Sequence, residues 1–311
     1  MNSILFYIIL TPLVTFAVSQ VLVILGQLLQ SNQIAFYGRS IASFHSLFLC
    51  AVYGTLASAC LNIAGYGGLG QWTTAKAFKW LMWISTGVWF DVEDDGQYAD
   101  TTRPAVFVCN HQTELDVLVI GHVFPKYCSV SSKKSLKHIP FLGWFMSLSK
   151  TVFIERSSRT QAVEAFNKAA QQMHSNKQSV FIFPEGTRSY YDHPDMLGFK
   201  KGAFHLAVQA QVPILPVVVA NYSNVLNVKK KMFRAGRIPL RVLKPVDTKG
   251  KTKEDVDALL QEVREKMLAE LRAMDQSARE QGIAAQKPEG SRNMDESAKS
   301  TGIDTGLNAA A

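Results

Sequence analysis

Residues 105–123 read AVFVCNHQTELDVLVIGHV and join an apolar run of strand length to a polar turn and a helical pattern. We expect Ala105–Cys109 to form a buried strand and Glu114–Val123 to form the helix after it. Three further apolar runs of strand length follow, at Thr151–Ile154, Ser179–Phe183 and Ile214–Ala220. Helical patterns at Thr160–Ser175 and Ala203–Gln209 lie between them. Strands that alternate with helices predict an α/β domain with a mostly parallel sheet flanked by helices.

The polar turn of this unit carries the sharpest chemical signal. His111 lies just after the expected strand, and Asp116 lies about one helical turn into the next pattern. A carboxylate in that position can reach Nδ1 of the imidazole and fix its tautomer, which leaves Nε2 to take a proton. A structural interpretation competes with this one, because Thr113 suits a helix N-cap and Asp116 would then complete a capping box. The motif alone leaves both interpretations open.

A second polar turn, FPEGTRS at residues 183–189, follows the apolar run SVFIF. Gly186 permits a tight turn that exposes backbone amides, and the Arg188 guanidinium offers a fork of donors that matches a phosphate. The alternative is an ordinary strand-to-loop turn with a surface Arg–Glu pair. A P-loop is excluded, because the sequence contains neither GxxxxGKS nor GxxxxGKT.

The N-terminal quarter of the sequence is strongly apolar. No charged side chain precedes Arg39, and none lies between Arg39 and Lys76. Ile4–Leu29 and Ile41–Ile63 are each long enough to cross a bilayer core, which takes about 20 helical residues. A cleaved signal peptide is a poor fit, because no basic region precedes the first run. We expect two membrane helices, spanning or re-entrant, that leave the N-terminus and the catalytic domain on the same side.

Phe78–Phe90 is too short to span a bilayer, and its three tryptophans beside Lys76 and Lys79 suit a segment at the headgroup level. An ordinary core helix is the alternative. The two lysines favour a cytosolic location for this side of the membrane. The predicted organisation has three parts: a membrane anchor of two hydrophobic helices at 1–74, a catalytic domain at 75–274, and a disordered polar tail at 275–311.

The formal net charge of +8 suits an anionic lipid, a phosphorylated substrate or nucleic acid equally well. No zinc-finger, RNA-binding or helix-turn-helix signature accompanies this charge, so the long apolar segments favour the lipid interpretations. The four cysteines form no CxxC pair and no metal-ligand spacing with histidine. They predict reduced, mostly buried thiols and no metal site.

Six ordered motifs resemble those of one known family. They are NHQTELD (110–116), KKSLKHIPFLGW (133–144), VFIER (152–156), FPEGTRS (183–189), FKKGAFHLA (199–207) and VPILPVV (212–218). An HxxxxD block followed at this spacing by FPEGTR resembles the glycerolipid acyltransferases of the 1-acylglycerol-3-phosphate acyltransferase (lysophosphatidic acid acyltransferase) type. The resemblance covers roughly residues 75–250. It implies acyl-CoA-dependent acylation of the sn-2 hydroxyl of lysophosphatidic acid to give phosphatidic acid.

The resemblance also implies a role for each matched residue. His111 would be the general base that deprotonates the acceptor hydroxyl, and Asp116 would orient and support it. The phosphate-bearing head would be held by residues from three motifs: Glu185, Gly186, Thr187, Arg188, Arg156 and Lys133. A structural salt bridge is the alternative for Arg156. Cys109, beside His111, is expected to be part of the strand and not a nucleophile.

Acyl-CoA is the expected co-substrate, with no resident cofactor, and the expected partner is the membrane bilayer and not nucleic acid. The family's usual location indicates the endoplasmic reticulum, with the catalytic domain facing the cytosol. A basic patch at Lys229–Lys231 and Arg234 could meet anionic headgroups or CoA phosphates, or could be a solvated face. Two alternatives stay open: a catalytically silent lipid-binding membrane protein, and an acyltransferase for another lysophospholipid or for glycerol-3-phosphate.

Overall fold

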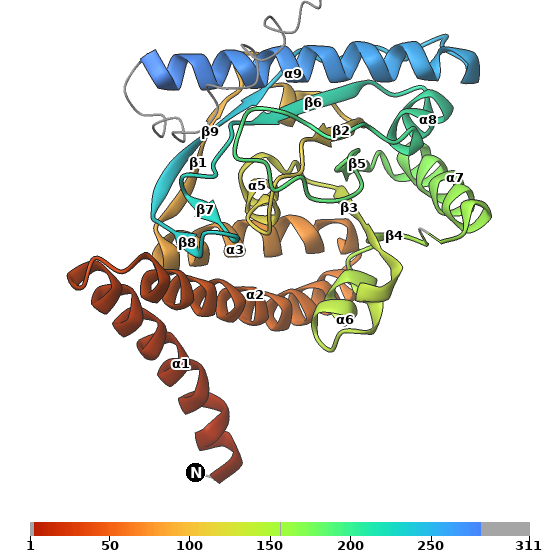
Figure 1. Cartoon of the computed structure of the whole chain (residues 1–311). Helices are drawn as coiled ribbons and strands as arrows, with labels where there is room; N and C mark the ends of the chain where they lie inside the picture. The colour runs from red at the N-terminus through yellow and green to blue at the C-terminus, as the bar shows by residue number, and fades with distance from the viewer. Residues whose placement is uncertain (1–2, 156, 281–311) are drawn as a thin grey trace, which may run out of the picture.

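The computed structural model describes residues 3–155 and 157–280 (Figure 1). A seven-stranded sheet lies at its centre, in the order β1-β9-β6-β2-β5-β3-β4. Its strands are β1 (Val88–Glu93), β2 (Val106–Cys109), β3 (Cys128–Lys133), β4 (Val152–Ile154), β5 (Ser179–Ile182), β6 (Ile214–Val219) and β9 (Gly236–Val242). A two-stranded hairpin of β7 (Leu226–Asn227) and β8 (Met232–Phe233) lies outside this sheet.

Helices cover both faces of the sheet. They are α1 (Ser3–Leu28), α2 (Asn32–Ile63), α3 (Gly70–Thr86), α4 (Tyr98–Thr101), α5 (Asp116–Val123), α6 (Leu142–Leu148), α7 (Arg159–Asn176), α8 (Gly202–Ala210) and α9 (Val256–Glu280), with 3₁₀ turns η1 (Gly67–Leu69), η2 (Lys134–His138) and η3 (Lys253–Asp255). α7, α8 and α9 pack on one face, and α3 and α5 pack on the other (Figure 1). Val106 and Phe107 of β2 belong to these two different cores, as the alternation of a strand requires.

The predicted mostly parallel sheet is confirmed. Within the described sheet, β6 and β9 pair antiparallel and the other neighbouring strands pair parallel. β2, β5 and β6 are fully buried, which explains their continuous apolar sequences. β1, β3 and β9 were not predicted. Each lies nearer an edge of the sheet and mixes polar with apolar residues, so none forms an apolar run.

Phe78–Phe90, predicted as one interfacial segment, is divided between two elements. α3 ends at Thr86, Gly87 takes a left-handed φ of 73°, and β1 follows. Glycine ends a helix in this conformation at little cost because it has no Cβ. Trp80 and Trp83 are 51% and 47% exposed. These exposed tryptophans lie on the outer face of α3, while its inner face belongs to the core.

α1 and α2 are both long and apolar enough to cross a membrane. α1 diverges from the rest of the protein, whereas α2 runs beneath α3 (Figure 1). A Cβ at Gly54 of α2 would lie only 2.7 Å from Thr74 Oγ1, so the two helices pack closely there. The buried side of α2 is made mostly of small residues: Gly38, Ala42, Ser46, Cys50, Ala51, Gly54 and Ser58. α2 is thus packed on the folded domain, and the predicted boundary before residue 75 falls inside α3.

α9 is the long amphipathic helix over β6 and β9 (Figure 1). Its buried residues repeat at helical spacing: Val256, Leu259, Leu260, Val263, Met267, Leu271 and Met274. The helix continues to Glu280, so the first residues of the predicted tail at 275–311 are helical. The rest of that tail lies outside the described residues.

Candidate active site

Two polar turns from distant parts of the sequence meet at the carboxyl ends of β2 and β5. The two strands pair in parallel, so both end at the same edge of the sheet. The Ser189 amide donates to the His111 carbonyl over 2.9 Å, and the Tyr190 amide donates to the Gln112 carbonyl over 3.1 Å. The His111 ring also stacks on Phe183, with ring centroids 4.2 Å apart. The HxxxxD and FPEGTR motifs therefore form one site.

His111 and Asp116 form the predicted pair. Nδ1 of His111 lies 2.8 Å from Oδ2 of Asp116. The carboxylate is fully buried, whereas the His111 side chain is 18% exposed, so the imidazole keeps an accessible edge. The same Oδ2 accepts the backbone amides of Gln112 and Thr113. α5 begins at Asp116 with Leu115 as its N-cap, so Thr113 does not cap the helix. Asp116 both closes the turn and holds the histidine.

The groups that contact the Asp116 carboxylate determine the tautomer of His111. The Tyr222 hydroxyl donates to Oδ1 over 2.6 Å and lies 2.8 Å from Thr113 Oγ1. Burial and the Asp116 charge raise the pKa of Tyr222 well above its usual value, so the phenol stays a donor. An ionised carboxylate only accepts hydrogen bonds, so Nδ1 of His111 carries a proton and Nε2 is left as the acceptor.

Tyr222 is a site residue that the sequence reasoning missed. It follows β6, and 106 positions separate it from Asp116. Its neighbours in the sequence, Asn221 and Ser223, form no motif with it. Only the pairing of β6 beside β2 brings its hydroxyl to the carboxylate.

Two buried amide side chains tie the His111 turn to β6. The Asn110 side chain exchanges two hydrogen bonds with the backbone of Val219, each 2.9 Å long. Nε2 of Gln112 donates to the carbonyls of Val219 and Ala220. These bonds hold the turn against the neighbouring strand, so the position of His111 does not depend on its own turn alone.

Glu185 has a different role from the headgroup contact that was predicted for it. Its side chain is buried, with Oε1 accepting the His111 amide over 2.6 Å and Oε2 accepting the Leu197 amide over 2.8 Å. Burial raises the pKa of this carboxyl to about 7, although the two backbone hydrogen bonds lower it. Glu185 therefore positions the backbone of His111 from inside the protein, and the predicted contact with substrate is replaced by this positioning role.

We expect Glu185→Ala to lower the free energy of unfolding by roughly 2–4 kcal/mol, because two buried amides each lose an acceptor worth about 1–3 kcal/mol. The raised pKa means that the folded state favours the protonated carboxyl. The advantage of wild type over the variant should therefore be largest near pH 4.5 and shrink as the pH rises to about 7. Denaturant unfolding across that window measures both effects.

The control for this experiment is Glu265→Ala, at an exposed position of α9. This variant should stay within about 0.5 kcal/mol of wild type at each pH. Equal stability of the Glu185 and Glu265 variants would contradict the positioning role.

Arg188 lies on the open side of the second turn. Its Nη1 is 3.0 Å from Glu114 Oε1, and the Tyr190 hydroxyl donates to the same oxygen over 2.6 Å. The surface Arg–Glu pair of the alternative interpretation is thus present. Among the described residues the hydrogen bonds of the guanidinium involve only Nη1. Nε and Nη2 remain available to a phosphate, so the pair and a binding role are compatible.

Gly186 forms the tight turn that its identity predicts, with a φ of 72°. The Lys200 side chain crosses over it: a Cβ on Gly186 would lie 2.7 Å from Lys200 Cε. Thr187 is exposed beside them. Lys200 therefore adds a cation near the turn. It was not singled out from the sequence, although it lies within the FKKGAFHLA motif.

The structure brings together only part of the predicted headgroup set. Lys133 is exposed at the end of β3, and it lies at the same sheet edge because β3 pairs in parallel with β5. No hydrogen bond or ion pair joins its side chain to Arg188 or Thr187 in the described part of the chain. Arg156 lies outside the described residues. Phosphate binding by Lys133 and Arg156 stays a prediction.

Cys109 is not placed to act as a nucleophile. It is fully buried, and burial together with the charges of Asp116 and Glu185 raises the pKa of its thiol well above the usual value. The thiol therefore stays protonated in the core. Three of the four free cysteines are buried and Cys60 is exposed, which confirms the prediction of mostly buried, unpaired thiols.

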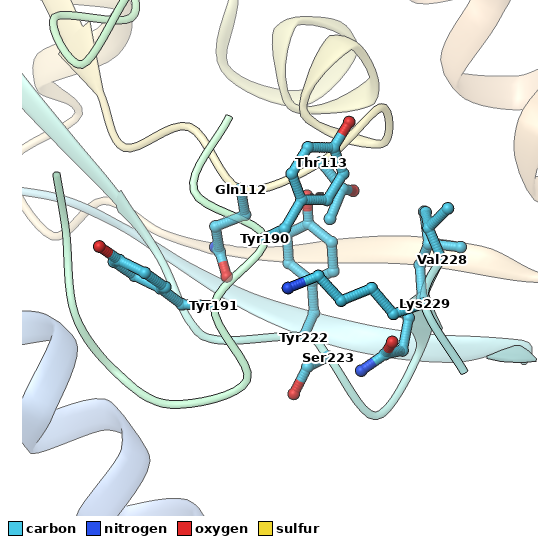
Figure 2. A pocket seen from close by; sticks show the side chains of 10 residues that line it. Gln112, Thr113, Tyr190, Tyr191, Tyr222, Ser223, Val228 and Lys229 are labelled. Atoms are coloured by element: carbon cyan, nitrogen blue, oxygen red, sulfur yellow. Dashed lines mark hydrogen bonds between the residues drawn. The ribbon is translucent and has the colours of Figure 1, made fainter. Parts of the chain in front are cut away.

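A narrow groove lies beside the His111 turn (Figure 2). It is lined by Gln112, Thr113, Tyr190, Tyr191, Tyr222, Ser223, Leu226, Asn227, Val228 and Lys229. Its volume of about 10 Å³ has room for about one water molecule and not for a substrate. Figure 2 shows the Lys229 side chain extending from the segment after β7 toward the tyrosines. One lysine of the predicted basic patch therefore lies beside the site.

Comparison with known proteins gives consistent matches. A model of the acyltransferase family matches residues 91–220, from β1 to the end of β6. The 1-acyl-sn-glycerol-3-phosphate acyltransferase of Saccharomyces cerevisiae is 41% identical over 237 residues, which cover 76% of this chain and 78% of the relative. The human 1-acyl-sn-glycerol-3-phosphate acyltransferase alpha is 39% identical over 189 residues, covering 61% and 66% of the two chains.

An uncharacterised acyltransferase of Schizosaccharomyces pombe is 44% identical over 229 residues, which cover 74% of this chain and 82% of the relative. The crystal structure of a 1-acyl-sn-glycerophosphate acyltransferase from Thermotoga maritima has a similar fold, with a TM-score of 0.58. The match covers 76% of this chain and 96% of that one, at 24% identity. At this identity the similarity bears on the fold alone.

Proposed function

Because this chain belongs to the 1-acyl-sn-glycerol-3-phosphate acyltransferase family and is an acyltransferase, we propose that it acylates the sn-2 hydroxyl of lysophosphatidic acid. Acyl-CoA is the donor, phosphatidic acid is the product, and no resident cofactor takes part. The observation that carries the proposal is the His111–Asp116 pair, whose accessible imidazole lies beside the turn that bears Arg188. A base and a phosphate-binding group are then available at one edge of the sheet.

The reaction follows from the tautomer of His111. Nε2 removes the proton from the sn-2 hydroxyl as the hydroxyl oxygen attacks the thioester carbonyl carbon. The new C–O bond forms, the C–S bond of acyl-CoA breaks, and the CoA thiolate leaves and takes up a proton. Asp116 stabilises the imidazolium through Nδ1, and its carboxylate is held in place by four hydrogen bonds. The acceptor itself is the nucleophile, so no acyl-enzyme forms.

We assign the phosphate of the acceptor to the turn at 186–188. Thr187 offers its backbone amide, whereas the Gly186 amide already donates to the Phe183 carbonyl over 3.1 Å, and Arg188 offers the donors that Glu114 leaves free. The exposed end of β3 places Lys133 at the same sheet edge as a second cation. A phosphomonoester carries nearly two negative charges, so it gains more from these cations than a zwitterionic head does.

We expect Arg188→Ala to raise KM for lysophosphatidic acid about 10- to 100-fold, because charge-assisted hydrogen bonds are worth about 1.5–3 kcal/mol. KM for acyl-CoA should change little, and Arg188→Lys should recover part of the loss. Initial rates of CoA release at varied acceptor concentration measure the effect. Arg272→Ala, at an exposed position of α9, is the matched control. An unchanged acceptor KM in Arg188→Ala would remove Arg188 from the headgroup site.

We further propose that α1 and α2 hold the enzyme at a bilayer, with α2 in the membrane plane. One side of α2 packs on α3, and large apolar residues lie exposed elsewhere on it: Phe44, Phe48, Tyr53, Leu56 and Ile63. A helix that packs along its length against a polar domain is better suited to lie in the membrane–water interface than to cross the bilayer. We place the enzyme at the endoplasmic reticulum membrane with the catalytic domain facing the cytosol.

The acceptor assignment is tested by release of free CoA from oleoyl-CoA by the full chain in detergent. Three acceptors are compared: lysophosphatidic acid, glycerol-3-phosphate and lysophosphatidylcholine. We expect release with lysophosphatidic acid and at least tenfold slower release with the other two. Fastest release with another acceptor would overturn the substrate assignment but keep the acyltransferase chemistry. No release with any of them would favour the catalytically silent lipid-binding alternative.

A further inference from the structure

A second polar pocket lies at the elbow between α1 and α2, away from the His111 groove. It is open and has a volume of about 470 Å³. Two arginines, Arg39 and Arg234, line it together with neutral residues that include Gln27, Gln30 and Asn32. No carboxylate lines it in the described part of the chain, and it shares no lining residue with the groove beside His111. Its charged groups are thus all cationic.

Arg39 places a buried positive charge in the wall of this pocket. The residue is only 5% exposed, and its Nε and Nη1 donate to the carbonyls of Thr86 and Phe233, each over 3.1 Å. Nη2 has no acceptor among the residues that the structure describes. Arg39 also forms no ion pair with any described residue. A buried guanidinium without a counter-ion is costly, so an anion brought to the pocket would be stabilised there.

Two further features add to the positive potential. Arg234 reaches the pocket from the segment after β8, and its Nη2 donates to Asn32 Oδ1 over 3.3 Å. The pocket also opens at the first turn of α2, where the Ser31 side chain caps the Ile34 amide. The N-terminus of a helix of this length carries a partial positive charge. Two guanidinium groups and a helix N-terminus therefore converge on one cavity.

We propose that this pocket binds the phosphate of an anionic phospholipid at the elbow of the two membrane helices. Arg39 would supply a fixed buried charge, and Arg234 would close over the phosphate from the outer side. A planar guanidinium matches phosphate oxygens, and a pair of them neutralises a phosphodiester or phosphomonoester. The site is a binding site separate from the acceptor site, and it makes no demand on the reaction at His111.

The surroundings favour a lipid over free phosphate. The end of α1 and the residue after it expose apolar side chains next to the pocket, with Leu25, Leu28 and Leu29 being 42%, 74% and 66% exposed. Acyl chains attached to a phosphate in the pocket could run along these residues, which free phosphate cannot use. The anionic headgroups of a membrane would also lie at the level of these two arginines.

The test is a calorimetric titration of the full chain in detergent with dihexanoyl phosphatidylglycerol, which is neither an acceptor nor a product of the proposed reaction. We expect phosphatidylglycerol to bind more tightly than dihexanoyl phosphatidylcholine. Arg234→Ala should weaken its binding about tenfold or more, the equivalent of one charge-assisted hydrogen bond. Competition with inorganic phosphate distinguishes a lipid ligand from free phosphate. If millimolar phosphate does not displace the lipid, the acyl chains contribute to binding. If it displaces the lipid fully, phosphate alone is sufficient for binding.

Lys230→Ala is the matched control, because Lys230 is an exposed cation of the β7–β8 connection, close to Arg234 in the sequence, that does not line the pocket. Its affinity should stay within about twofold of wild type, since surface charge alone is screened. Equal effects of the two variants, or equal binding of the two lipids, would overturn the proposal. Acylation of lysophosphatidic acid by Arg234→Ala in neutral micelles should match wild type, so failure here is distinguishable from failure of the proposed reaction. Arg39→Gln is not the primary variant, because Arg39 also holds α3 and β8 in place.

Discussion

Replacing His111 with alanine should lower the rate of acyl transfer about 100- to 10,000-fold, the usual contribution of a positioned general base. The loss should fall on kcat, because the groups assigned to the phosphate remain. His111 is partly exposed and contributes to the core mainly by stacking on Phe183, so the variant should keep its fold. Release of CoA from oleoyl-CoA with lysophosphatidic acid measures the rate, and thermal unfolding checks the fold.

His174→Ala is the control for this variant, because His174 is exposed on α7, outside the two turns that form the site. It should retain the wild-type rate. Turnover of His111→Ala within a few-fold of wild type would remove the histidine from the mechanism.

Asp116→Asn should lower kcat by about 10³-fold or more with little change in KM, by analogy with other His–Asp pairs. Every group around the carboxylate donates a hydrogen bond, so an amide must turn its own NH₂ toward at least one donor. An NH₂ in the position of Oδ2 would face two backbone amides that cannot accept, so it should take the position of Oδ1 and face the Tyr222 hydroxyl, which can accept. Nδ1 of His111 then keeps its acceptor, but the negative charge that stabilises the imidazolium is lost although the geometry is kept.

Tyr222→Phe separates this effect from a general loss of packing. It removes one donor from Oδ1 of Asp116 but leaves the bonds to Oδ2 and the tautomer of His111 unchanged. We expect a loss of at most about tenfold in kcat. One hydrogen bond to a charged group is worth about 1.5–3 kcal/mol, and only part of this free energy affects the imidazole of His111. Equal losses in Tyr222→Phe and Asp116→Asn would show that the carboxylate acts through structure and not through its charge.

The central strands and their helices were predictable because they are buried. β2, β5 and β6 have apolar residues on both faces, so each is visible in the sequence as a continuous apolar run. α9 has a single apolar stripe, which is visible as a helical repeat of apolar residues. β3 and β9 were missed because strands nearer the sheet edges carry polar residues as well. The segment at 78–90 was misjudged for a related reason. Its tryptophans dominate the composition, while a single glycine, Gly87, decides where the helix ends.

The two motifs of the site were likewise predictable, since each follows a recognisable strand and keeps its residue types in a short stretch. The roles of the individual residues within these motifs were only partly predictable. Glu185 lies in a motif associated with the headgroup, yet its burial and its bonds to two backbone amides give it a positioning role. Arg188 was predicted either to offer its donors to a phosphate or to form a surface Arg–Glu pair, but its pairing with Glu114 depends on the two turns being adjacent.

The sequence by itself determined the α/β class, the apolar N-terminal helices, the His111–Asp116 spacing and the polar turn at residues 183–189, because each rests on residues that are close along the chain. The tertiary structure alone decided the rest. Tyr222 reaches Asp116 because β6 pairs beside β2, and Glu185 reaches His111 because β5 does. Arg39 and Arg234 share a pocket only because α2 packs beside β8. Such contacts join residues that are far apart in the sequence, and no local period or spacing records them.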